Sequence, residues 1–383
     1  MTVLDVALVA ARALVTAVML LTAMGYMTYF ERRLVAFFQW RIGPNRAGPL
    51  GLLQPAADGL KLLFKEQLMP AGARPFIYLA APCISLVVAL TSFAVIPVQL
   101  DASAFAHPAG SPSSPERHLW QIADINVGVL FLLGITSLAV YGIVLGGWAS
   151  GNKYSLIGAV RSSAQMVSYE LALGSALLSP LMMVSSLSFS QVVVYQEGQL
   201  WLGLAQPMAF LVFCIAGVAE TNRAPFDLPE AEQELGAGFH TEYSGMRFAL
   251  YFMAEYVAMI TVSAVATTVF LGGPWLYPGA TRAPLMGWLP TYSAIYFLLK
   301  IAMFMFIFIW LRATFPRFRY DQLMRIGWQV LLPLGLLNLA ITALGVVLDW
   351  THLQFTGVVL SVVILLYAFG KLNRRREDQA GHH

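Results

Sequence analysis

Long apolar runs recur along the chain and are separated by shorter segments that carry most of the charges. Crossing about 30 Å of hydrocarbon takes roughly 20 helical residues. Nine runs are long enough: 5–29, 76–98, 125–148, 164–186, 200–219, 247–272, 292–312, 327–348 and 353–370. None of them alternates apolar and polar residues as a barrel strand would. The pattern therefore predicts an all-α integral membrane protein with about nine transmembrane helices.

The composition agrees with this pattern and narrows the chemistry. Of the 383 residues 58% are hydrophobic and only 11% are charged, whereas a soluble protein is about a quarter charged. Cys83 and Cys214 lie in apolar runs without a second ligand at metal spacing, which argues against a disulfide framework, a zinc site or an iron–sulfur cluster. We therefore predict no cofactor bound by this chain. The net charge of +3 is small and gives by itself no sign of nucleic-acid binding, and we predict no nucleic-acid partner.

The basic residues fall mainly on one side of the membrane if the runs alternate in direction. Nineteen of them lie in one set of loops and two, Arg117 and Arg282, lie in the other. The positive-inside rule then places the N-terminus outside and the C-terminus in the cytoplasm. The inside loops at 30–75, 220–246 and 312–326 are also rich in Gly, Pro and aromatic residues. We expect the function to reside on this inside face.

The first inside loop contains a stretch of helical period at about residues 52–66. Gln54, Asp58, Lys61 and Lys65 recur at steps of four, three and four, and so share one face. The stretch is too short to span the bilayer, so we expect an amphipathic helix in the interface. This helix either anchors the surface or, together with the first span, frames a lateral opening for a lipid-soluble molecule.

Ionisable residues within the apolar runs are the next indication of function. Glu170, Glu255 and Lys300 lie inside predicted spans, and Glu220 lies at the inner end of another. Each costs about 2.5–3.5 kcal/mol in hydrocarbon, so we expect them to face the bundle interior or a hydrated cavity. They either form static ion pairs, such as one between Lys300 and a glutamate, or pass protons, because three acids against one base leave an acidic excess.

The inside loop that follows the fifth span is the most densely charged segment. Asp227 followed by Glu230 forms a capping-box pattern, which predicts a short helix here. Capping and the helix dipole explain part of the acidity. Glu230, Glu232 and Glu234 nevertheless crowd three negative charges into five residues, and 230 and 234 repel on one helix face. We interpret the excess as a negative funnel that could couple a loop motion to proton uptake by the intramembrane acids.

Four long motifs resemble the signatures of the H-type membrane subunits of NADH–quinone oxidoreductase, the respiratory complex I. They are ERRLVAFFQWRIGPNRAGPLGLLQPAADGLKLLFKE at 31–66, ETNRAPFDLPEAEQEL at 220–235, GFHTEYSGM at 238–246 and RATFPRFRYDQLM at 312–324. The resemblance covers residues 5 to about 349, so residues 1–350 are expected to form the membrane domain typical of the family. Residues 351–383 are then a C-terminal extension with a ninth helix and a basic cytoplasmic tail.

The resemblance implies a membrane subunit that helps form a quinone-binding chamber and couples quinone reduction to proton translocation. It implies that the first span, the amphipathic helix and the sixth span frame the entrance of the chamber, and that the headgroup end of the chamber belongs to partner subunits. The residues it implies for the chamber and its entrance are Arg32, Phe37, Trp40, Arg41, Arg46 and Asp58. The acids it implies for proton coupling are Asp227, Glu230, Glu232, Glu234, Glu220, Glu255 and Glu170. Supporting positions are Tyr169, Tyr251, Arg223 and Lys300, the two tyrosines as hydrogen-bond carriers in the acid chain.

The same resemblance implies the setting in which the chain works. Quinone would be the substrate of the whole complex, and FMN and iron–sulfur clusters would lie in partner subunits. The implied partners are hydrophilic quinone-site and iron–sulfur subunits, small membrane subunits that lead to antiporter-like subunits, and lipid, in a bacterial inner membrane. Two alternatives stay open: the homologous subunit of a ferredoxin-, deazaflavin- or hydrogenase-linked complex, and a stand-alone ion transporter, for which the sequence lacks a convincing internal repeat.

Overall fold

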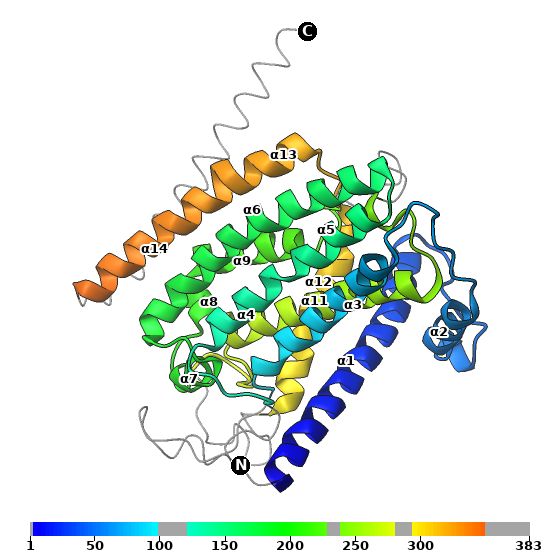
Figure 1. The fold of residues 1–383 in the computed structure, drawn as a ribbon. Helices are drawn as coiled ribbons and strands as arrows, with labels where there is room; N and C mark the ends of the chain where they lie inside the picture. Colours follow the sequence, from blue (N-terminus) through cyan, green and yellow to red (C-terminus); the bar gives the residue numbers. More distant parts are fainter. Residues whose placement is uncertain (1–2, 99–120, 228–237, 280–292, 349–383) are drawn as a thin grey trace.

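The fold is a bundle of helices of very unequal length (Figure 1). The computed structural model describes residues 3–98, 121–227, 238–279 and 293–348. Its longer elements, in chain order, are α1 Val3–Phe38, α2 Gln54–Phe64, α3 Pro75–Ser92, α4 Gly128–Ser137, α5 Ala139–Ala149, α6 Lys153–Val184, α7 Phe189–Tyr195, α8 Leu202–Ala205, α9 Pro207–Glu220, α11 Gly245–Phe270, α12 Ala294–Thr314, α13 Tyr320–Arg325 and α14 Leu332–Val347. Short 3₁₀ turns lie at Pro49–Gly51, Phe93–Val95 and Gly238–His240, and a π-helical segment at Ile326–Leu331 joins α13 to α14.

Seven helical segments in the described ranges are long and apolar enough to cross a membrane. Helices α4 and α5 form one of them, and the stretch from α13 to α14 forms another. Helix α9 is apolar but has only 14 residues. Together these segments account for eight of the nine predicted spans. The run at 353–370 and the predicted extension fall outside the described residues.

Two helices extend well beyond the predicted spans at their inner ends. Helix α1 continues to Phe38, past the charged residues where the apolar run stops. Helix α6 begins at Lys153, where the Asn152 side chain caps it by accepting a hydrogen bond from the Tyr154 amide. Hydropathy underestimates the length of both helices, because it measures transfer into lipid. The additional turns are held by contacts within the protein.

The predicted amphipathic helix is present as α2 and lies at the edge of the bundle, beside the inner end of α1 (Figure 1). The polar side chains on one face of α2 contact one another. The Gln54 amide donates to Asp58 Oδ1 over 3.1 Å, and Lys61 Nζ lies 3.7 Å from the same oxygen. All of its side chains are at least partly exposed, so the helix has an apolar face that is free to contact lipid or another subunit.

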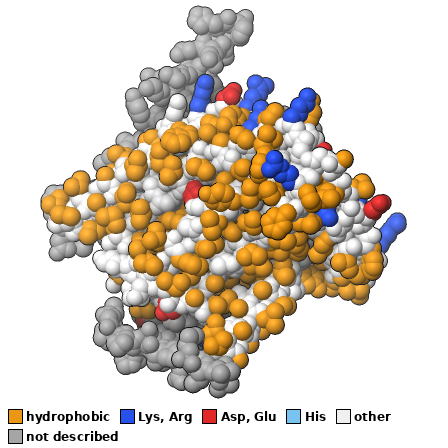
Figure 2. Space-filling model, viewed as in Figure 1, with side chains coloured by type: hydrophobic (Ala, Val, Ile, Leu, Met, Phe, Trp, Pro, Cys, Tyr) orange, Lys and Arg blue, Asp and Glu red, His pale blue; other side chains and the backbone are white. Residues whose placement is uncertain are grey.

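The outer surface of the bundle is apolar, whereas the interior holds many small polar side chains. Orange hydrophobic side chains cover most of the face in Figure 2, and the basic side chains gather along its upper and right edges, toward the inner ends of the helices. Inside, Thr261, Ser263, Thr267 and Thr268 of α11 each donate to the carbonyl one turn earlier. The hydroxyls of these four side chains are therefore satisfied within their own helix, as a bilayer requires.

The inside segment Gly238–His240 packs directly on α6 at Gly158. A Cβ added to Gly158 would lie 2.7 Å from the Gly238 Cα, 2.9 Å from its carbonyl carbon and 3.0 Å from the Phe239 nitrogen. These are backbone atoms and cannot rotate away. The hydroxyl of Ser155 also donates to the Phe239 carbonyl over 3.1 Å. The loop can therefore pack this closely on α6 only because residue 158 is glycine.

We expect Gly158→Ala to displace the segment Gly238–His240 and to destabilise the protein by about 1–3 kcal/mol, the usual cost of overpacking. The measurement is the thermal midpoint of the purified complex. Gly134→Ala is the matched control, because Gly134 lies in helix α4 with nothing within 4 Å of the added Cβ. Equal midpoints for the two variants would contradict the close approach.

Candidate functional site

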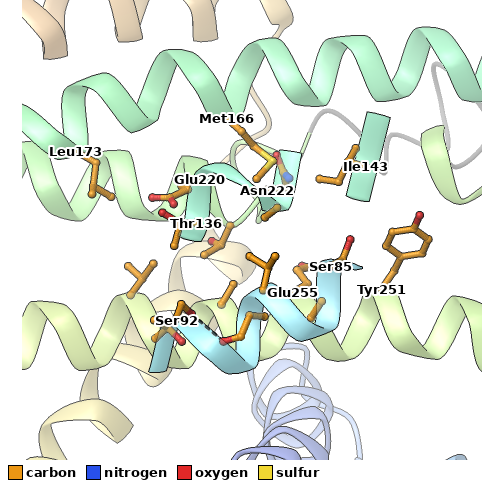
Figure 3. Close-up of a pocket in the computed structure, with 18 of the residues that line it drawn as sticks. Ser85, Ser92, Thr136, Ile143, Met166, Leu173, Glu220, Asn222, Tyr251 and Glu255 are labelled. Carbon is orange, nitrogen blue, oxygen red and sulfur yellow. Dashed lines mark hydrogen bonds between the residues drawn. The ribbon is translucent and has the colours of Figure 1, made fainter. Parts of the chain in front are cut away.

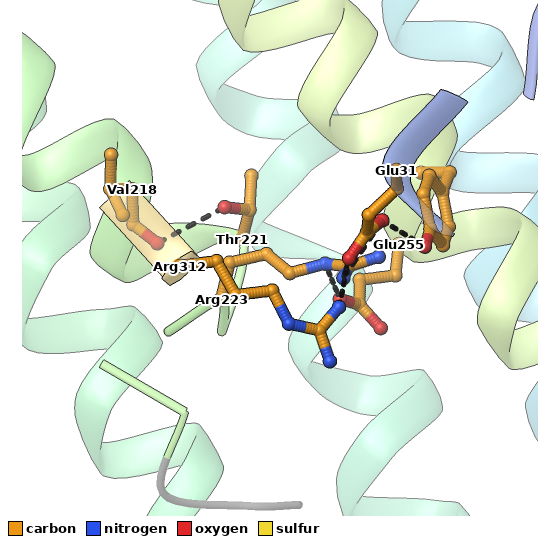
Figure 4. A network of polar contacts seen from close by, with 7 residues as sticks. Glu31, Val218, Thr221, Arg223, Glu255 and Arg312 are labelled. Atoms are coloured by element: carbon orange, nitrogen blue, oxygen red, sulfur yellow. Dashed lines mark hydrogen bonds and ion pairs between the residues drawn. The ribbon is translucent and has the colours of Figure 1, made fainter. Parts of the chain in front are cut away.

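A buried carboxylate connects four segments at the charged end of the bundle. Glu31 of α1 is 5% exposed. It accepts hydrogen bonds from Arg223 in the loop after α9, from Arg312 at the end of α12 and from the Tyr256 hydroxyl of α11. Arg223 Nη1 lies 3.1 Å from Glu31 Oε1, and both arginine side chains reach toward this carboxylate in Figure 4. We call these residues the Glu31 network.

Arg223 carries the network to a second acid. Its Nε atom pairs with Glu255 of α11, and its guanidinium carbon lies 4.1 Å from the centroid of the Tyr256 ring. Burial alone lowers the pKa of Arg223, but the carboxylates of Glu255 and Glu31 outweigh burial and raise this pKa above its ordinary value. Arg223 therefore keeps its positive charge while it is held between two acids.

A polar cavity of about 480 Å³ lies against the Glu31 network. Arg32 and Arg41, two of the predicted chamber residues, line it together with Glu31, Arg223 and Arg312. Arg32 also donates to Asp58 of α2 over 2.6 Å, so the amphipathic helix is tied to the wall of the cavity. The cavity thus offers several positively charged donors to a small polar ligand.

The other predicted chamber residues lie elsewhere in the described chain. Phe37 is 74% exposed and Trp40 is 98% exposed, and Arg46 is exposed as well. None of the three is among the residues that line the polar cavity. Their role in a chamber stays a prediction, and in this chain their side chains are open to contact with another molecule.

A second space is an apolar groove of about 710 Å³. Helices α1, α11 and α12 line it, with side chains such as Met19, Ala23 and Ile301. Phe30 and Leu34 of α1 face the groove, whereas Glu31, in the turn between them, faces the polar cavity. The two spaces are therefore lined by different side chains of the same helix, one within the apolar part of the bundle and one at its charged end.

A third cavity, of about 110 Å³, holds two of the predicted acids. Glu220 of α9 and Glu255 of α11 line it from different helices, together with Thr136, Asn222 and His240 (Figure 3). The third intramembrane acid is nearby. Glu170 accepts a hydrogen bond from Ser137, the residue after Thr136, and it is close enough to Glu220 to repel it. The structure thus brings the three predicted acids together, and we call this space the acid cavity.

The comparisons with known proteins identify the family. The sequence model of the NADH dehydrogenase family matches residues 11–343. The chain belongs to the NADH dehydrogenase family. It is 51% identical over 323 residues to the H subunit of the NADH-quinone oxidoreductase of Protochlamydia amoebophila, which covers 84% of this chain and 92% of that protein. It is 49% identical over 360 residues to NADH-quinone oxidoreductase subunit 8 of Thermus thermophilus, covering 94% of this chain and 93% of that one.

A third relative, also of the NADH dehydrogenase family, matches a similar share of this chain. The H 1 subunit of the NADH-quinone oxidoreductase of Geobacter sulfurreducens is 49% identical over 341 residues, which are 88% of this chain and 95% of that protein. The relatives therefore match nearly their full length. Among the described residues no group of three or more His, Cys, Asp or Glu side chains is arranged to hold a metal ion.

Three supporting residues make contacts that differ from the expected ones. The hydroxyl of Tyr169 donates to the Leu323 carbonyl over 2.9 Å, and that of Tyr251 donates to the Gly142 carbonyl over 3.0 Å. Both tyrosines therefore fasten neighbouring helices and do not donate to the acids as expected. Tyr251 still lines the acid cavity through its ring.

Lys300, the third of these residues, forms no ion pair with a glutamate in the described chain. Its ammonium donates to the carbonyls of Leu271, Gly273 and Trp275 at the far end of α11, and it lies 4.1 Å from the centroid of the Trp201 ring. A rise of 1.5 Å per residue puts this end of α11 about 24 Å from Glu255. Lys300 therefore caps a helix end, and the alternative of a static ion pair between Lys300 and a glutamate is not found among the described residues.

The acidic loop is described only at its start. Asp227 accepts a hydrogen bond from Arg317 at its backbone carbonyl. Glu230, Glu232 and Glu234 lie outside the described residues, as does the short helix predicted there. The negative funnel stays a prediction.

Glu31, Tyr256 and Arg312 were not among the predicted site residues. The helical period could have indicated Glu31, because this residue lies on the same side of α1 as the buried residues Leu20 and Met27. That signal was missed because the first span was predicted to end before the charged residues. The partners of Glu31 lie 192 to 281 residues away in sequence, and no local pattern indicates them.

We expect Glu31→Gln to destabilise the inner end of the bundle, because it removes a counter-charge from two arginines. Breaking a buried pair costs about 3–5 kcal/mol. The measurement is the thermal midpoint of the purified complex, with Glu66→Gln on the exposed inside loop as the control. A midpoint equal to that of the control variant would show that the network contributes little to stability.

Proposed function

We propose that the chain is the H-type membrane subunit of a proton-translocating NADH–quinone oxidoreductase, in which it helps form the quinone chamber and couples quinone reduction to proton movement. The observation that carries this proposal is the arrangement of the three spaces. Helices α1, α11 and α12 line both the apolar groove and the polar cavity, and the polar cavity is joined to the acid cavity through Arg223 and Glu255. This arrangement suits a ligand with a long apolar tail and a small polar head.

The groove and the polar cavity match the two parts of a quinone. The isoprenoid tail is hydrocarbon, and the groove is lined almost wholly by apolar side chains. The head carries two carbonyl oxygens, and Arg32, Arg41 and Arg312 supply cationic donors in the polar cavity, on the way to the headgroup end of the chamber in partner subunits. Of the three elements expected to frame the entrance, α1 and α11 line the groove together with α12. Helix α2 lines neither space, and its Asp58 is joined to Arg32 in the wall of the polar cavity.

The acid cavity suits the transfer of protons. Glu220 and Glu255 share a small space with hydroxyl and amide side chains, and Glu170 interacts with Ser137 at its edge. Acids in a low-dielectric interior change protonation when a neighbouring charge changes. A change of charge in the polar cavity can therefore be converted into uptake or release of a proton.

The remaining features belong to the complex as a whole. FMN and iron–sulfur clusters would lie in partner subunits, together with hydrophilic quinone-site subunits on the inside face and small membrane subunits that lead to antiporter-like subunits. The distribution of nineteen basic residues against two supports a bacterial inner-membrane location with the N-terminus outside and the C-terminus in the cytoplasm. The relatives' names favour quinone reduction over a ferredoxin-, deazaflavin- or hydrogenase-linked complex.

We expect Ala23→Phe to obstruct the apolar groove, because Ala23 lies in its wall on α1. The KM for a long-tailed quinone should rise by up to about tenfold, the equivalent of roughly 1.4 kcal/mol, while the KM for a short-tailed quinone changes less. Ala11→Phe is the control, since Ala11 is exposed on the same helix and lies outside the groove. Equal KM changes for both quinones would argue against a tail path here.

We expect Glu220→Gln to lower proton translocation per NADH oxidised in membrane vesicles, because an amide cannot take up a proton. NADH oxidation by an artificial hydrophilic acceptor should stay at the wild-type rate, since that reaction does not use the membrane subunit. Glu66→Gln again serves as the exposed control. Wild-type proton translocation in Glu220→Gln would remove Glu220 from the coupling path.

A further inference from the structure

The acid cavity extends along α11 away from the charged end of the bundle. Tyr251, Glu255 and Val265 all line it, and a rise of 1.5 Å per residue puts the first and the last of them about 21 Å apart. Helix α11 ends at Phe270, which is little more than one turn beyond Val265. A short stretch of protein therefore separates the far end of this cavity from the end of the helix.

An apolar plug fills that short stretch. Val269 and Phe270 are both 0% exposed. The Phe270 ring packs against those of Phe210 and Phe213, with 5.3 and 5.2 Å between the ring centroids. An apolar constriction excludes bulk water, but it does not distinguish a cation from an anion. A charge beside the plug would supply that distinction.

Lys300 places a positive charge at this end of α11. Its ammonium donates to the carbonyls of Leu271, Gly273 and Trp275, and three acceptors use all three donors of the charged group. Its remaining partner in the described chain is the Trp201 ring, and no described carboxylate neutralises it. An unneutralised charge among apolar helices is costly, and a neutral donor could cap the helix without that cost. The charge itself therefore calls for a function.

The charge is close enough to act on the far end of the acid cavity. The Leu271 carbonyl lies six residues after Val265, about 9 Å along the helix axis. At an effective dielectric constant of about 20, one unit charge at this distance changes the occupancy of a proton about twentyfold. The C-terminus of α11 carries about half a negative charge, so Lys300 reverses the sign to about half a positive charge. A proton here is therefore disfavoured about fivefold with Lys300 and favoured by about as much without it.

We propose that Lys300 is an electrostatic barrier that closes the acid cavity toward the side of the membrane opposite the charged end, an inference that rests on the proposed function. Acids that take up protons from one side of a membrane lose them if their cavity opens to the other side. The apolar plug excludes water, and the ammonium raises the free energy of any cation that enters the plug. Protons taken up by Glu220 and Glu255 are thus kept from leaking across the membrane through this chain.

The test is the passive proton leak of the intact complex in liposomes, without NADH or quinone. A potassium gradient with valinomycin sets the membrane potential, and a trapped pH-sensitive dye reports proton entry. Lys300→Gln removes the charge, while its amide can still donate to two of the three carbonyls. We expect its leak to exceed that of the wild type at least about threefold, and Lys300→Arg, which keeps the charge, to leak as the wild type does. A wild-type leak in Lys300→Gln would overturn the barrier.

Lys153→Gln is the matched control. Lys153 also lies over an aromatic ring, that of Tyr154 at 5.2 Å, but it begins α6 and is not among the residues that line the acid cavity. Its loss should leave the leak at the wild-type level. A leak that rises equally in Lys153→Gln and Lys300→Gln would show that the position of the charge is irrelevant, and would overturn the inference.

A second pair of variants covers the case in which Lys300→Gln does not assemble. The Trp201 ring centroid lies 4.1 Å from the Lys300 ammonium, so a carboxylate at position 201 can pair with Lys300 and cancel its charge. We expect Trp201→Glu to raise the leak at least about threefold. Trp201→Gln has the same size but leaves the charge in place, and should leak as the wild type does. Equal leaks in these two variants would attribute the effect to packing and overturn the barrier.

The leak and the coupling can fail separately. In membrane vesicles, protons translocated per NADH should fall in Lys300→Gln, because part of the translocated protons return through the leak. An unchanged leak together with wild-type translocation in this variant would overturn the inference and leave the proposed function intact. Wild-type translocation in Glu220→Gln would instead count against the proposed function, whatever the leak.

Discussion

The burial of Glu31 is the constraint on which the inner end of the bundle depends. A carboxylate at this depth is tolerated only with counter-charges and donors, and Arg223, Arg312 and Tyr256 bring these from three other segments. Only 6% of the most apolar window of α1 is buried in the protein. In a bilayer, apolar surface gives little drive for one helix to join another, so the charged contacts at one end must position α1.

This attachment at one end explains the apolar groove. Helices α1 and α12 meet where Arg312 contacts Glu31, and along the apolar part of the bundle their side chains line a space of about 710 Å³. A close-packed interface along the whole of α1 would have filled it. The same contact therefore closes the charged end of the space and leaves the end within the hydrocarbon open to a lipid-soluble molecule.

The sequence predicted those features that a single local rule controls. Bilayer thickness sets the length of the spans, helical period identifies α2, and the cost of a charge in hydrocarbon singles out Glu170, Glu220 and Glu255. Contacts between distant segments were beyond these rules. Lys300 satisfies its charge with backbone carbonyls, which have no signature in the sequence. Glu31 was overlooked because its partners come from residues that are distant in the chain.

The acid cavity is built partly from loops, and this makes its shape dependent on the inside face. Asn222 and His240 line it from the loops on either side of the undescribed acidic segment. The second of these loops is fixed by backbone contact at Gly158, and the first carries Arg223. The loop after α9 therefore contributes Asn222 to the lining of the acid cavity and Arg223 to the ion pair with Glu255. The position of this one loop sets both the shape of the cavity and the pairing of a carboxylate that lines it.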